Sequence, residues 1–387
     1  MQTLIELFDE RPLENVLSTE MFHPRRTVFI CPPEAAANQA LQAQLRAYFK
    51  RRGVECECIF LQGGMTDAAA VARRIKEILQ KYPDCALDIA GGTDAALFAS
   101  GLVCAQTALP VFTYSRKNNS FYNIHNAPFA QGVRGPLEWT VEEALLMAGG
   151  AARQGRVDNA RLGEYRGLFG PLFSLFLRFR REWPAITGYI QRASAPREGA
   201  NALSAEAPYL VKGGQGRRLR APEAALREMA RLGLIGSLEI LPGERVRFSF
   251  ADGQVRAWLR DVGSPLELFV YQACLDTGAF HDVRSSVVVD WPGANQVTNE
   301  LDVMATSGVK TAFISCKACA VKTEALNELA ILRDRFGGQM ARAAIVTAER
   351  GRAPMRQRAA ELNIDVIELE DLKNDFLPQR LRALLRG

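Results

Sequence analysis

The sequence predicts an α/β protein with two domains: a Rossmann-like N-terminal domain and a C-terminal α/β domain with a mixed sheet. Short apolar segments of strand length alternate with helical segments over residues 1–150, and they do so again over residues 261–387. Residues 151–260 are less regular and form a connector. A chain of 387 residues is long enough for two domains, and 48% hydrophobic with 24% charged residues is typical of globular proteins.

The first domain is predicted from strands and helices that follow each other at the spacing of β–α–β units. Asp67 is a suitable N-cap for the second helix. Such alternation favours a parallel sheet with right-handed crossovers. The expected strands are 26–31, 55–61, 86–90 and 110–114, and the expected helices are 35–52, 67–79 and 95–105.

The connector contains a predicted helix over 222–232, a hairpin around Pro242-Gly243 and a further strand over 255–259. A helix followed by a hairpin is compatible with a winged helix, but we favour the first strands of the C-terminal domain. The aromatic and basic stretch 173–183 has the composition of a surface that stacks single-stranded bases. Its apolar residues recur at helical spacing, which favours a helix facing the core.

The C-terminal domain is predicted from a helix, three strands, and then alternating helices and strands. This order favours a mixed sheet covered by helices. The expected helices are 265–274, 323–336 and 353–362, and the expected strands are 285–290, 300–305, 311–316, 343–347 and 365–369.

The net charge of +5 is unevenly distributed along the chain. Residues 151–260 carry 19 basic and 10 acidic side chains, whereas residues 1–150 and 261–387 each have a net charge of −2. A basic segment beside an acidic site suits a partner with a phosphate backbone, although an arginine-rich solvated surface gives the same count.

We expect a cytoplasmic protein without a membrane partner. The first ten residues contain early acids and lack a secretory leader, and the longest apolar run is too short to span a bilayer. The eight cysteines are expected to be reduced thiols. Cys316 and Cys319 have Cys-x-x-Cys spacing, but no second pair completes a zinc site, and the three histidines form no motif.

The loop Gly91-Gly92-Thr93 follows a predicted parallel strand and begins a helix. Ligands of open α/β sheets bind at this edge, where glycines allow close approach and helix N–H groups face the ligand. The loop lacks both the Gly-x-Gly-x-x-Gly pattern and a P-loop lysine, which argues against a dinucleotide or ATP. By itself the loop is equally compatible with an ordinary tight turn.

Together with Thr3–Asp9, Glu14-Asn15 and Val28–Ile30, the segment Asp88–Asp94 resembles the CRISPR-associated Rossmann-fold (CARF) sensor domains. The resemblance covers roughly residues 1–145. It implies a homodimer that binds a cyclic oligoadenylate, with cyclic tetra-adenylate favoured. The family usually has a lysine where this chain has Asp94, so Lys117 or Asn118 is a candidate to compensate, as is Arg116. The implied ligand-binding residues are Gly91, Gly92, Thr93, Asp94, Pro32 and Arg116.

The C-terminal domain carries an acid and a lysine on consecutive strands, Asp302 and Lys317. Cleavage of a phosphodiester needs a metal held by carboxylates, and a lysine stabilises the charge that develops on the phosphate. Lys317 ends an apolar strand, where an unpaired ammonium is costly, so we expect an anionic partner. Glu267, near the start of the 265–274 helix, is the third candidate. Taken singly, Asp302 is also compatible with a turn acid, and Glu267 with an exposed helix charge.

This half of the chain resembles the PD-(D/E)xK nuclease domains that are fused to such sensors. The resemblance rests on Leu266-Glu267, Asn299–Val303, Phe313–Lys317 and Leu332–Gly338. It implies a nuclease dependent on Mg²⁺ or Mn²⁺ that acts on DNA and sometimes RNA. Its implied catalytic residues are Glu267, Asp302, Lys317, Glu300 and Ser315, and its metal ligands are Glu267, Asp302 and the Cys316 carbonyl.

Ser315 is the departure from the motif, because the family has an acid there. A hydroxyl ligates a divalent metal less well than a carboxylate. Glu300 or a water is a candidate replacement, and reduced activity or inactivity is the other outcome.

We therefore expect a cyclic-oligoadenylate-activated, metal-dependent nuclease in antiviral type III CRISPR defence. Two alternatives stay open. One is a ligand-gated regulator that binds DNA through a winged helix in residues 222–259. The other is a ring nuclease whose sensor domain degrades its own activator.

Overall fold

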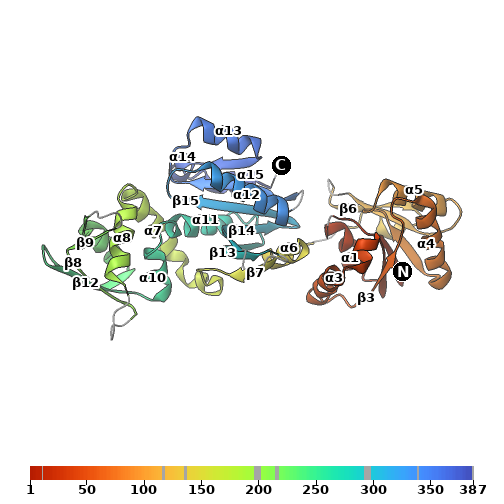
Figure 1. The fold of residues 1–387 in the computed structure, drawn as a ribbon, viewed down its shortest axis with the longest axis horizontal. Coiled ribbons are helices and arrows are strands. Elements are labelled where there is room, and N and C mark those ends of the chain that lie inside the picture. The colour runs from red at the N-terminus through yellow and green to blue at the C-terminus, as the bar shows by residue number, and fades with distance from the viewer. Residues whose placement is uncertain are drawn as a thin grey trace. The chain divides into compact units, whose positions relative to one another are not determined.

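The computed structural model describes residues 1–10, 12–115, 118–134, 137–195, 202–213, 218–291, 298–337 and 340–385. The chain forms two compact units (Figure 1). The first contains Met1–Ala151, and the second contains Ala152–Asp290 and most of the remaining C-terminal chain. Within the described residues, no helix is long and apolar enough to cross a membrane.

The first unit is built on a six-stranded sheet whose strands follow the order β3-β2-β1-β4-β5-β6. The first five strands in this order are parallel, as predicted, and β6 is antiparallel to β5. The sequence reading missed the central strand β1, in which the acid Glu6 interrupts an otherwise apolar and fully buried segment. It also missed β6. The strands are β1 (Thr3–Leu7), β2 (Arg26–Cys31), β3 (Glu57–Gln62), β4 (Cys85–Asp88), β5 (Val111–Ser115) and β6 (Ser120–His125).

The helices of this unit begin where the sequence supplies caps. The Asp67 side chain accepts hydrogen bonds from the amides of Ala69 and Ala70, which confirms it as the N-cap of α4. The helix predicted over 35–52 is divided at Asn38, which leaves the helical region and caps the second part. The helices are α1 (Leu17–Phe22), α2 (Pro33–Ala37), α3 (Gln39–Arg51), α4 (Ala68–Lys81), α5 (Asp94–Cys104) and α6 (Val141–Met147).

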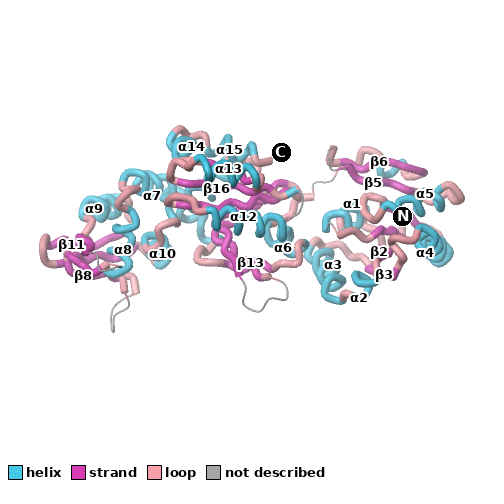
Figure 2. Tube along the Cα trace, turned by 45° about the horizontal axis from the view of Figure 1, so that its top comes forward, coloured by secondary structure: helices cyan, strands magenta, loops and turns pink. Residues whose placement is uncertain are grey.

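The second unit contains a six-stranded mixed sheet in the order β17-β16-β15-β14-β13-β7 (Figure 2). The pairs β13–β14 and β14–β15 are antiparallel, whereas β15–β16 and β16–β17 are parallel, as the mixed-sheet prediction requires. The strands are β7 (Ala151–Gln154), β13 (Asp282–Asp290), β14 (Thr298–Ser307), β15 (Lys310–Lys317), β16 (Arg342–Thr347) and β17 (Ile364–Ile367).

Helices α11 and α12 pack on opposite faces of this sheet. The α11 residues Leu266 and Cys274 share one hydrophobic cluster with Val303 and Ile314 of the sheet. Side chains alternate along a strand, so the neighbours of Val303 and Ile314 point to the other face, towards α12. The helices of the C-terminal part are α11 (Ser264–Asp276), α12 (Thr323–Phe336), α13 (Ala353–Glu361), α14 (Leu369–Lys373) and α15 (Leu377–Ala383).

The helix and hairpin predicted around residues 222–250 do form, but they do not join the C-terminal sheet. Strands β11 and β12 pair with β8 in a separate three-stranded sheet, so they are not strands of the C-terminal sheet, although they belong to the same compact unit. Residues 255–259 are helical, because Asp252 caps α10 through the amides of Gln254 and Val255. The elements are α9 (Glu223–Arg231), β8 (Ser204–Pro208), β11 (Ile235–Leu241), β12 (Arg245–Phe250) and α10 (Gly253–Leu259).

The aromatic stretch is part of the core, as predicted. Phe173 and Phe176 on α7 (Arg166–Arg178) are buried, and Phe173 stacks on Phe269 of α11. Helix α8 (Trp183–Ala193) contributes the buried Trp183 to the same cluster. The remaining short strands β9 (Leu210–Lys212) and β10 (Arg218–Arg220) form an antiparallel pair.

Candidate active site

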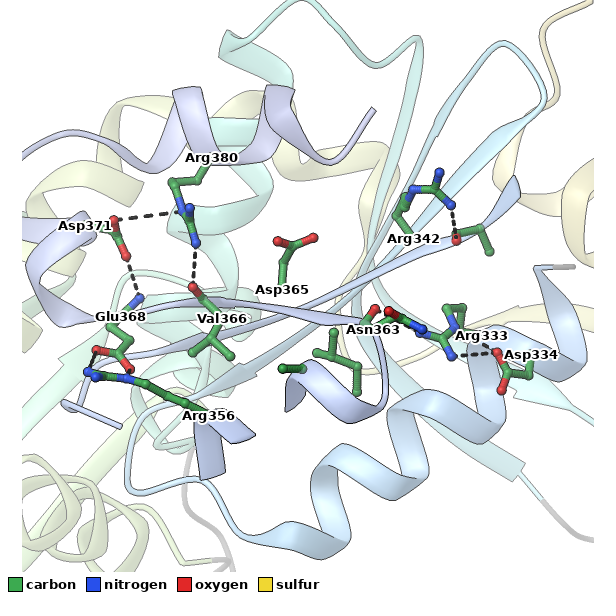
Figure 3. A pocket seen from close by; sticks show the side chains of 13 residues that line it. Arg333, Asp334, Arg342, Arg356, Asn363, Asp365, Val366, Glu368, Asp371 and Arg380 are labelled. Atoms are coloured by element: carbon green, nitrogen blue, oxygen red, sulfur yellow. Dashed lines mark hydrogen bonds and ion pairs between the residues drawn. The ribbon is translucent and has the colours of Figure 1, made fainter. Parts of the chain in front are cut away.

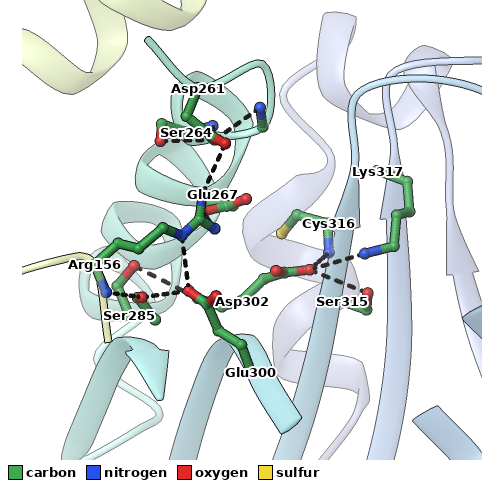
Figure 4. Close-up of polar contacts among 12 residues, drawn as sticks. Arg156, Asp261, Ser264, Glu267, Ser285, Glu300, Asp302, Ser315, Cys316 and Lys317 are labelled. Carbon is green, nitrogen blue, oxygen red and sulfur yellow. Dashed lines mark hydrogen bonds and ion pairs between the residues drawn. The ribbon is translucent and has the colours of Figure 1, made fainter. Parts of the chain in front are cut away.

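The site in the second unit forms where β14 and β15 separate (Figure 4). These strands are paired up to Val303 and Ile314. Continuing that register by one residue places Asp302 opposite Ser315, with their side chains on the same face. Both residues are only 9% exposed. The sheet geometry thus brings two residues from separate strands into one polar site.

Asp302 is the centre of this site. One carboxylate oxygen accepts hydrogen bonds from Ser315 Oγ at 3.1 Å, from the Cys316 amide at 2.6 Å and from Lys317 Nζ at 3.3 Å. Burial disfavours the charged form of Lys317, but the neighbouring Asp302 carboxylate outweighs it and raises the pKa of the ammonium. Lys317 therefore has the anionic partner expected from the sequence, and it is positively charged at neutral pH.

Glu267 reaches the same region from the first turn of α11 and is 5% exposed. Burial raises its pKa to about 8, the charge of Asp302 adds to this rise, and Arg156 opposes it. The raised pKa of Glu267 indicates that its surroundings are short of positive charge.

Arg156 supplies part of that charge and was not singled out in the sequence. It follows β7, and its guanidinium lies 2.7 Å from Asp261, 3.0 Å from Glu300 and 3.6 Å from Glu267. These carboxylates outweigh burial and raise its pKa above the usual value. The excess of arginine in residues 151–260 was the signal that pointed to this segment.

Glu300, the predicted substitute for the missing motif acid, lies at the edge of the site. Its Oε1 accepts hydrogen bonds from Arg156 Nε and from Ser286 Oγ. The structure therefore ties Glu300 to the arginine, and its role as a replacement for the acid stays a prediction.

A cavity of about 40 Å³ lies over the Asp302 network. Its walls come from the ends of β14 and β15 and from one face of α12, and they include Glu328, an acid that was not considered from the sequence. The lining residues are Glu300, Leu301, Asp302, Ser315, Lys317, Ala325, Glu328, Leu329 and Leu332.

The donor atoms of the site suit a hard divalent cation. Carboxylates, a hydroxyl and a backbone carbonyl are oxygen donors, which Mg²⁺ and Mn²⁺ prefer. Asp302, Glu267, Ser315 and the Cys316 carbonyl offer this set. Among the residues that the structure describes, no three carboxylate, histidine or cysteine side chains are gathered closely enough to hold a metal without rearrangement.

A second cavity, of about 960 Å³, opens beside β17 and is lined by four arginines (Figure 3). Arg356 pairs with Glu368, Arg380 donates to the Val366 carbonyl, and Arg333 donates to the carbonyls of Leu362 and Asn363. These three guanidinium groups already bind a carboxylate and backbone carbonyls of the same unit. The acidic site around Asp302 is therefore the better candidate for catalysis.

In the first unit, Gly91-Gly92-Thr93 connects β4 to α5, as predicted, at the carboxyl edge of the sheet. A Cβ at position 91 would lie 2.9 Å from the Leu7 carbonyl oxygen, and Gly92 has a φ of +96°. Both glycines are therefore required by the loop. The Gly92 amide donates to Asp9 at 3.0 Å, and the Thr93 side chain accepts from the Ala96 amide as the N-cap of α5.

The other residues predicted for ligand binding differ in where the structure places them. Pro32 directly follows the parallel strand β2 and precedes α2, so it lies on the same sheet edge as the loop. Asp94 is exposed in the first turn of α5. Arg116 lies outside the described residues. Asn118, named as an alternative, donates to the Tyr122 hydroxyl.

Buried acids beneath the loop were missed as a group. Glu6 and Asp88 are both about 1% exposed. Burial raises the pKa of Asp88 to about 7, and burial together with Asp88 raises the pKa of Glu6 well above its usual range. Asp88 accepts hydrogen bonds from Ser18 and from the Ala90 amide, which anchors the start of the loop.

Comparison with known proteins defines the class of this site. Residues 256–383 match the family described as Card1-like, endonuclease domain. The segment contains Glu267, Asp302, Ser315 and Lys317. The match confirms the prediction that the chain is a nuclease.

Solved structures resemble the whole chain. Protein VC1899 from Vibrio cholerae has a TM-score of 0.74 at 20% identity, covering 99% of this chain and 98% of that one. Can2 from Sulfobacillus thermosulfidooxidans, solved in complex with cyclic tetra-adenylate, has a TM-score of 0.70 at 18% identity, covering 100% and 98%. No curated protein matches the sequence. The predicted fold class, an α/β chain with a Rossmann-like N-terminal domain and a C-terminal α/β domain, is thereby confirmed.

Proposed function

We propose that this chain is a cyclic-oligoadenylate-activated, divalent-metal-dependent nuclease of type III CRISPR defence. The observation that carries the proposal is the ion pair between buried Asp302 and half-buried Lys317, which lies beside Glu267 within a segment that matches an endonuclease family. The Rossmann-like unit on the same chain supplies a second site with a glycine loop. The similar Can2 structure contains cyclic tetra-adenylate, which supports that ring as the activator.

The nuclease chemistry follows from the charges of the site. Asp302 and Glu267 would hold Mg²⁺ or Mn²⁺, with the Cys316 carbonyl as a further ligand. The bound ion would activate a water and neutralise charge on the phosphate. Lys317, held charged by Asp302, would stabilise the negative charge that develops during cleavage. DNA, and sometimes RNA, is the expected substrate.

The sensor would use the carboxyl edge of its parallel sheet, where Pro32 and the Gly91–Asp94 loop lie. A ring of repeating nucleotides is symmetric, and a homodimer matches that symmetry by presenting two copies of the loop. Binding of the ring by a homodimer would then regulate the nuclease unit.

Cleavage assays test this function. The protein is incubated with Mn²⁺ or Mg²⁺, labelled DNA or RNA, and each cyclic oligoadenylate in turn, and both substrate and activator are followed. We expect cleavage only with metal and one ring size, and its loss in Asp302→Ala and Lys317→Ala variants. Unchanged cleavage in both variants would refute the assignment.

The same assay separates the alternatives. Binding of duplex DNA without metal and without cleavage would favour the regulator, and the separate β8–β11–β12 sheet with α9 is the element that this function requires. Linear oligoadenylate products from the Asp302→Ala variant would favour a ring nuclease.

A further inference from the structure

The active site lacks the acid that the motif places at position 315, and the geometry of the sheet indicates where a replacement lies. Side chains on a strand alternate between faces, so Ser315 and Lys317 point to one face and Cys316 to the other. Cys316 belongs to the hydrophobic cluster that contains α11 residues. Asp302, Ser315 and Lys317 therefore share the face that α12 covers.

Helix α12 presents one face to this site. Ala325, Glu328, Leu329 and Leu332 recur at helical spacing, and all four line the cavity that also contains Asp302, Ser315 and Lys317. Leu329 and Leu332 are only 2% and 3% exposed, so their burial fixes the helix in this orientation. Glu328 is the acid that α12 contributes to the cavity.

The contacts of the two nearby acids distinguish them as substitutes. Glu300 is bound by the charged Arg156 and by the Ser286 hydroxyl, so freeing its carboxylate breaks an ion pair and a hydrogen bond. Glu328 is exposed and accepts a hydrogen bond from the neutral side-chain amide of Asn299 at 2.6 Å. Freeing Glu328 breaks one neutral hydrogen bond, whereas freeing Glu300 breaks both an ion pair and a hydrogen bond.

We propose that Glu328 supplies the carboxylate that position 315 lacks, so that the metal is held by an acid from α12 in place of one from β15. This inference rests on the proposed nuclease function. A glutamate has three rotatable side-chain bonds, so its carboxylate can leave Asn299 by side-chain rotation, and Glu328 lines the same cavity as Asp302. Asn299 holds Glu328 at the rim of the cavity until the metal binds.

Metal binding without nucleic acid is the first test. Mn²⁺ affinity is measured by titration calorimetry and by the electron paramagnetic resonance signal of free Mn²⁺, with the full-length protein. Glu328→Gln should weaken Mn²⁺ binding by about tenfold or more, since even outer-shell changes cost about 10–100-fold. Glu324→Gln, which alters an exposed acid of the same helix outside the cavity, should stay within about twofold of the unsubstituted protein.

Rescue is the second test. The double variant Ser315→Glu with Glu328→Gln returns the acid to the strand position, and we expect it to recover Mn²⁺ affinity and cleavage by about tenfold over Glu328→Gln alone. Glutamine preserves the shape of residue 328 and can still accept from Asn299, and circular dichroism checks that each variant is folded.

The outcomes separate this inference from the proposed function. If the unsubstituted protein binds Mn²⁺ and cleaves, but Glu328→Gln does the same, the Glu328 assignment is wrong and the nuclease assignment stands. Loss of binding in Glu300→Gln with none in Glu328→Gln assigns the role to Glu300. If the unsubstituted protein neither binds Mn²⁺ nor cleaves with any cyclic oligoadenylate, both proposals fail together.

Discussion

Arg156 offers a quantitative test of the electrostatics of the site. Replacement by glutamine removes a cation that contacts Asp261, Glu267 and Glu300. The Arg156 side chain is 46% exposed and two of its partners are about one third exposed, so these two pairs contribute about 0.5 kcal/mol each. The Glu267 side chain is buried, and where its carboxylate is charged the loss of its partner costs more, here about 1 kcal/mol after screening.

Arg156→Gln should therefore lower the free energy of unfolding by about 2 kcal/mol. For a unit of this size, this corresponds to a fall of roughly 4–8 °C in the midpoint of thermal unfolding. It should depend on pH. Burial already raises the pKa of Glu267 to about 8, so the folded state binds more protons than the unfolded state between about pH 4.5 and 8, and stability falls as pH rises. Without Arg156 the pKa of Glu267 rises further. The loss of stability in Arg156→Gln should therefore be larger at pH 9, where Glu267 is charged in the unsubstituted protein, than at pH 6.

Hydrogen exchange at the amides of β14 and β15 measures the opening free energy of this unit, with rates referenced to the intrinsic exchange at each pH. The matched control is Arg153→Gln in the same segment, whose partner Asp290 is partly exposed, and its effect on stability should be much smaller than that of Arg156→Gln. Equal losses in the two variants, or a larger loss at pH 6, would refute the reasoning.

Two further predictions concern the first unit. Gly92→Ala should destabilise this unit by about 2 kcal/mol and weaken cyclic oligoadenylate binding, because residue 92 has a φ of +96° and its Cβ would lie 2.8 Å from Leu7 Cβ. Gly101→Ala on α5 is the control: a Cβ there meets no atom within 4 Å, so the change should stabilise the unit by about 0.5–1 kcal/mol. Hydrogen exchange on β1 and β4 measures the stability of both variants. Similar changes in the two variants would contradict the argument. The raised pKa values of Asp88, about 7, and of Glu6 mean that the folded unit binds more protons, so its stability should fall between about pH 4 and 7. Asp88 alone contributes about 4 kcal/mol to this fall, at about 1.4 kcal/mol per pKa unit, and Glu6 adds to it. Glu6→Gln should therefore reduce the fall. Unfolding by urea at a series of pH values checks the slope, which a flat profile would contradict.

The helices were predictable because their signals are local. The prediction of a helix over 323–336 coincides with α12, and Asp67 caps α4 as expected. Strand β1 was missed because Glu6 breaks its apolar pattern, and only the centre of a folded sheet holds that carboxyl in a buried place. The hairpin of β11 and β12 was located correctly but assigned to the wrong sheet. Its pairing with β8 is a long-range contact that the residues of the hairpin do not specify.

The candidate site divides in the same way. Asp302 and Lys317 were named from residue type and spacing, and Glu267 and Ser315 from the resemblance to PD-(D/E)xK nucleases. The structure brings all four together. Arg156 was missed because its contact with Glu300 joins residues 144 positions apart. Their catalytic and metal-binding roles stay predictions until the variants are measured.

The sequence by itself determined the order of the elements, the glycine loop of the first unit, and the acid and lysine on consecutive strands of the second. These follow from apolar periodicity, backbone conformation and the chemistry of single side chains, which act over a few residues. Only the tertiary structure decided which acids lie near Ser315 and what each of them contacts. Strand alternation turns Asp302 and Ser315 towards α12, and the packing of α12 places Glu328 in their cavity while Arg156 binds Glu300. These relations depend on long-range register and packing, which no local pattern in the chain specifies.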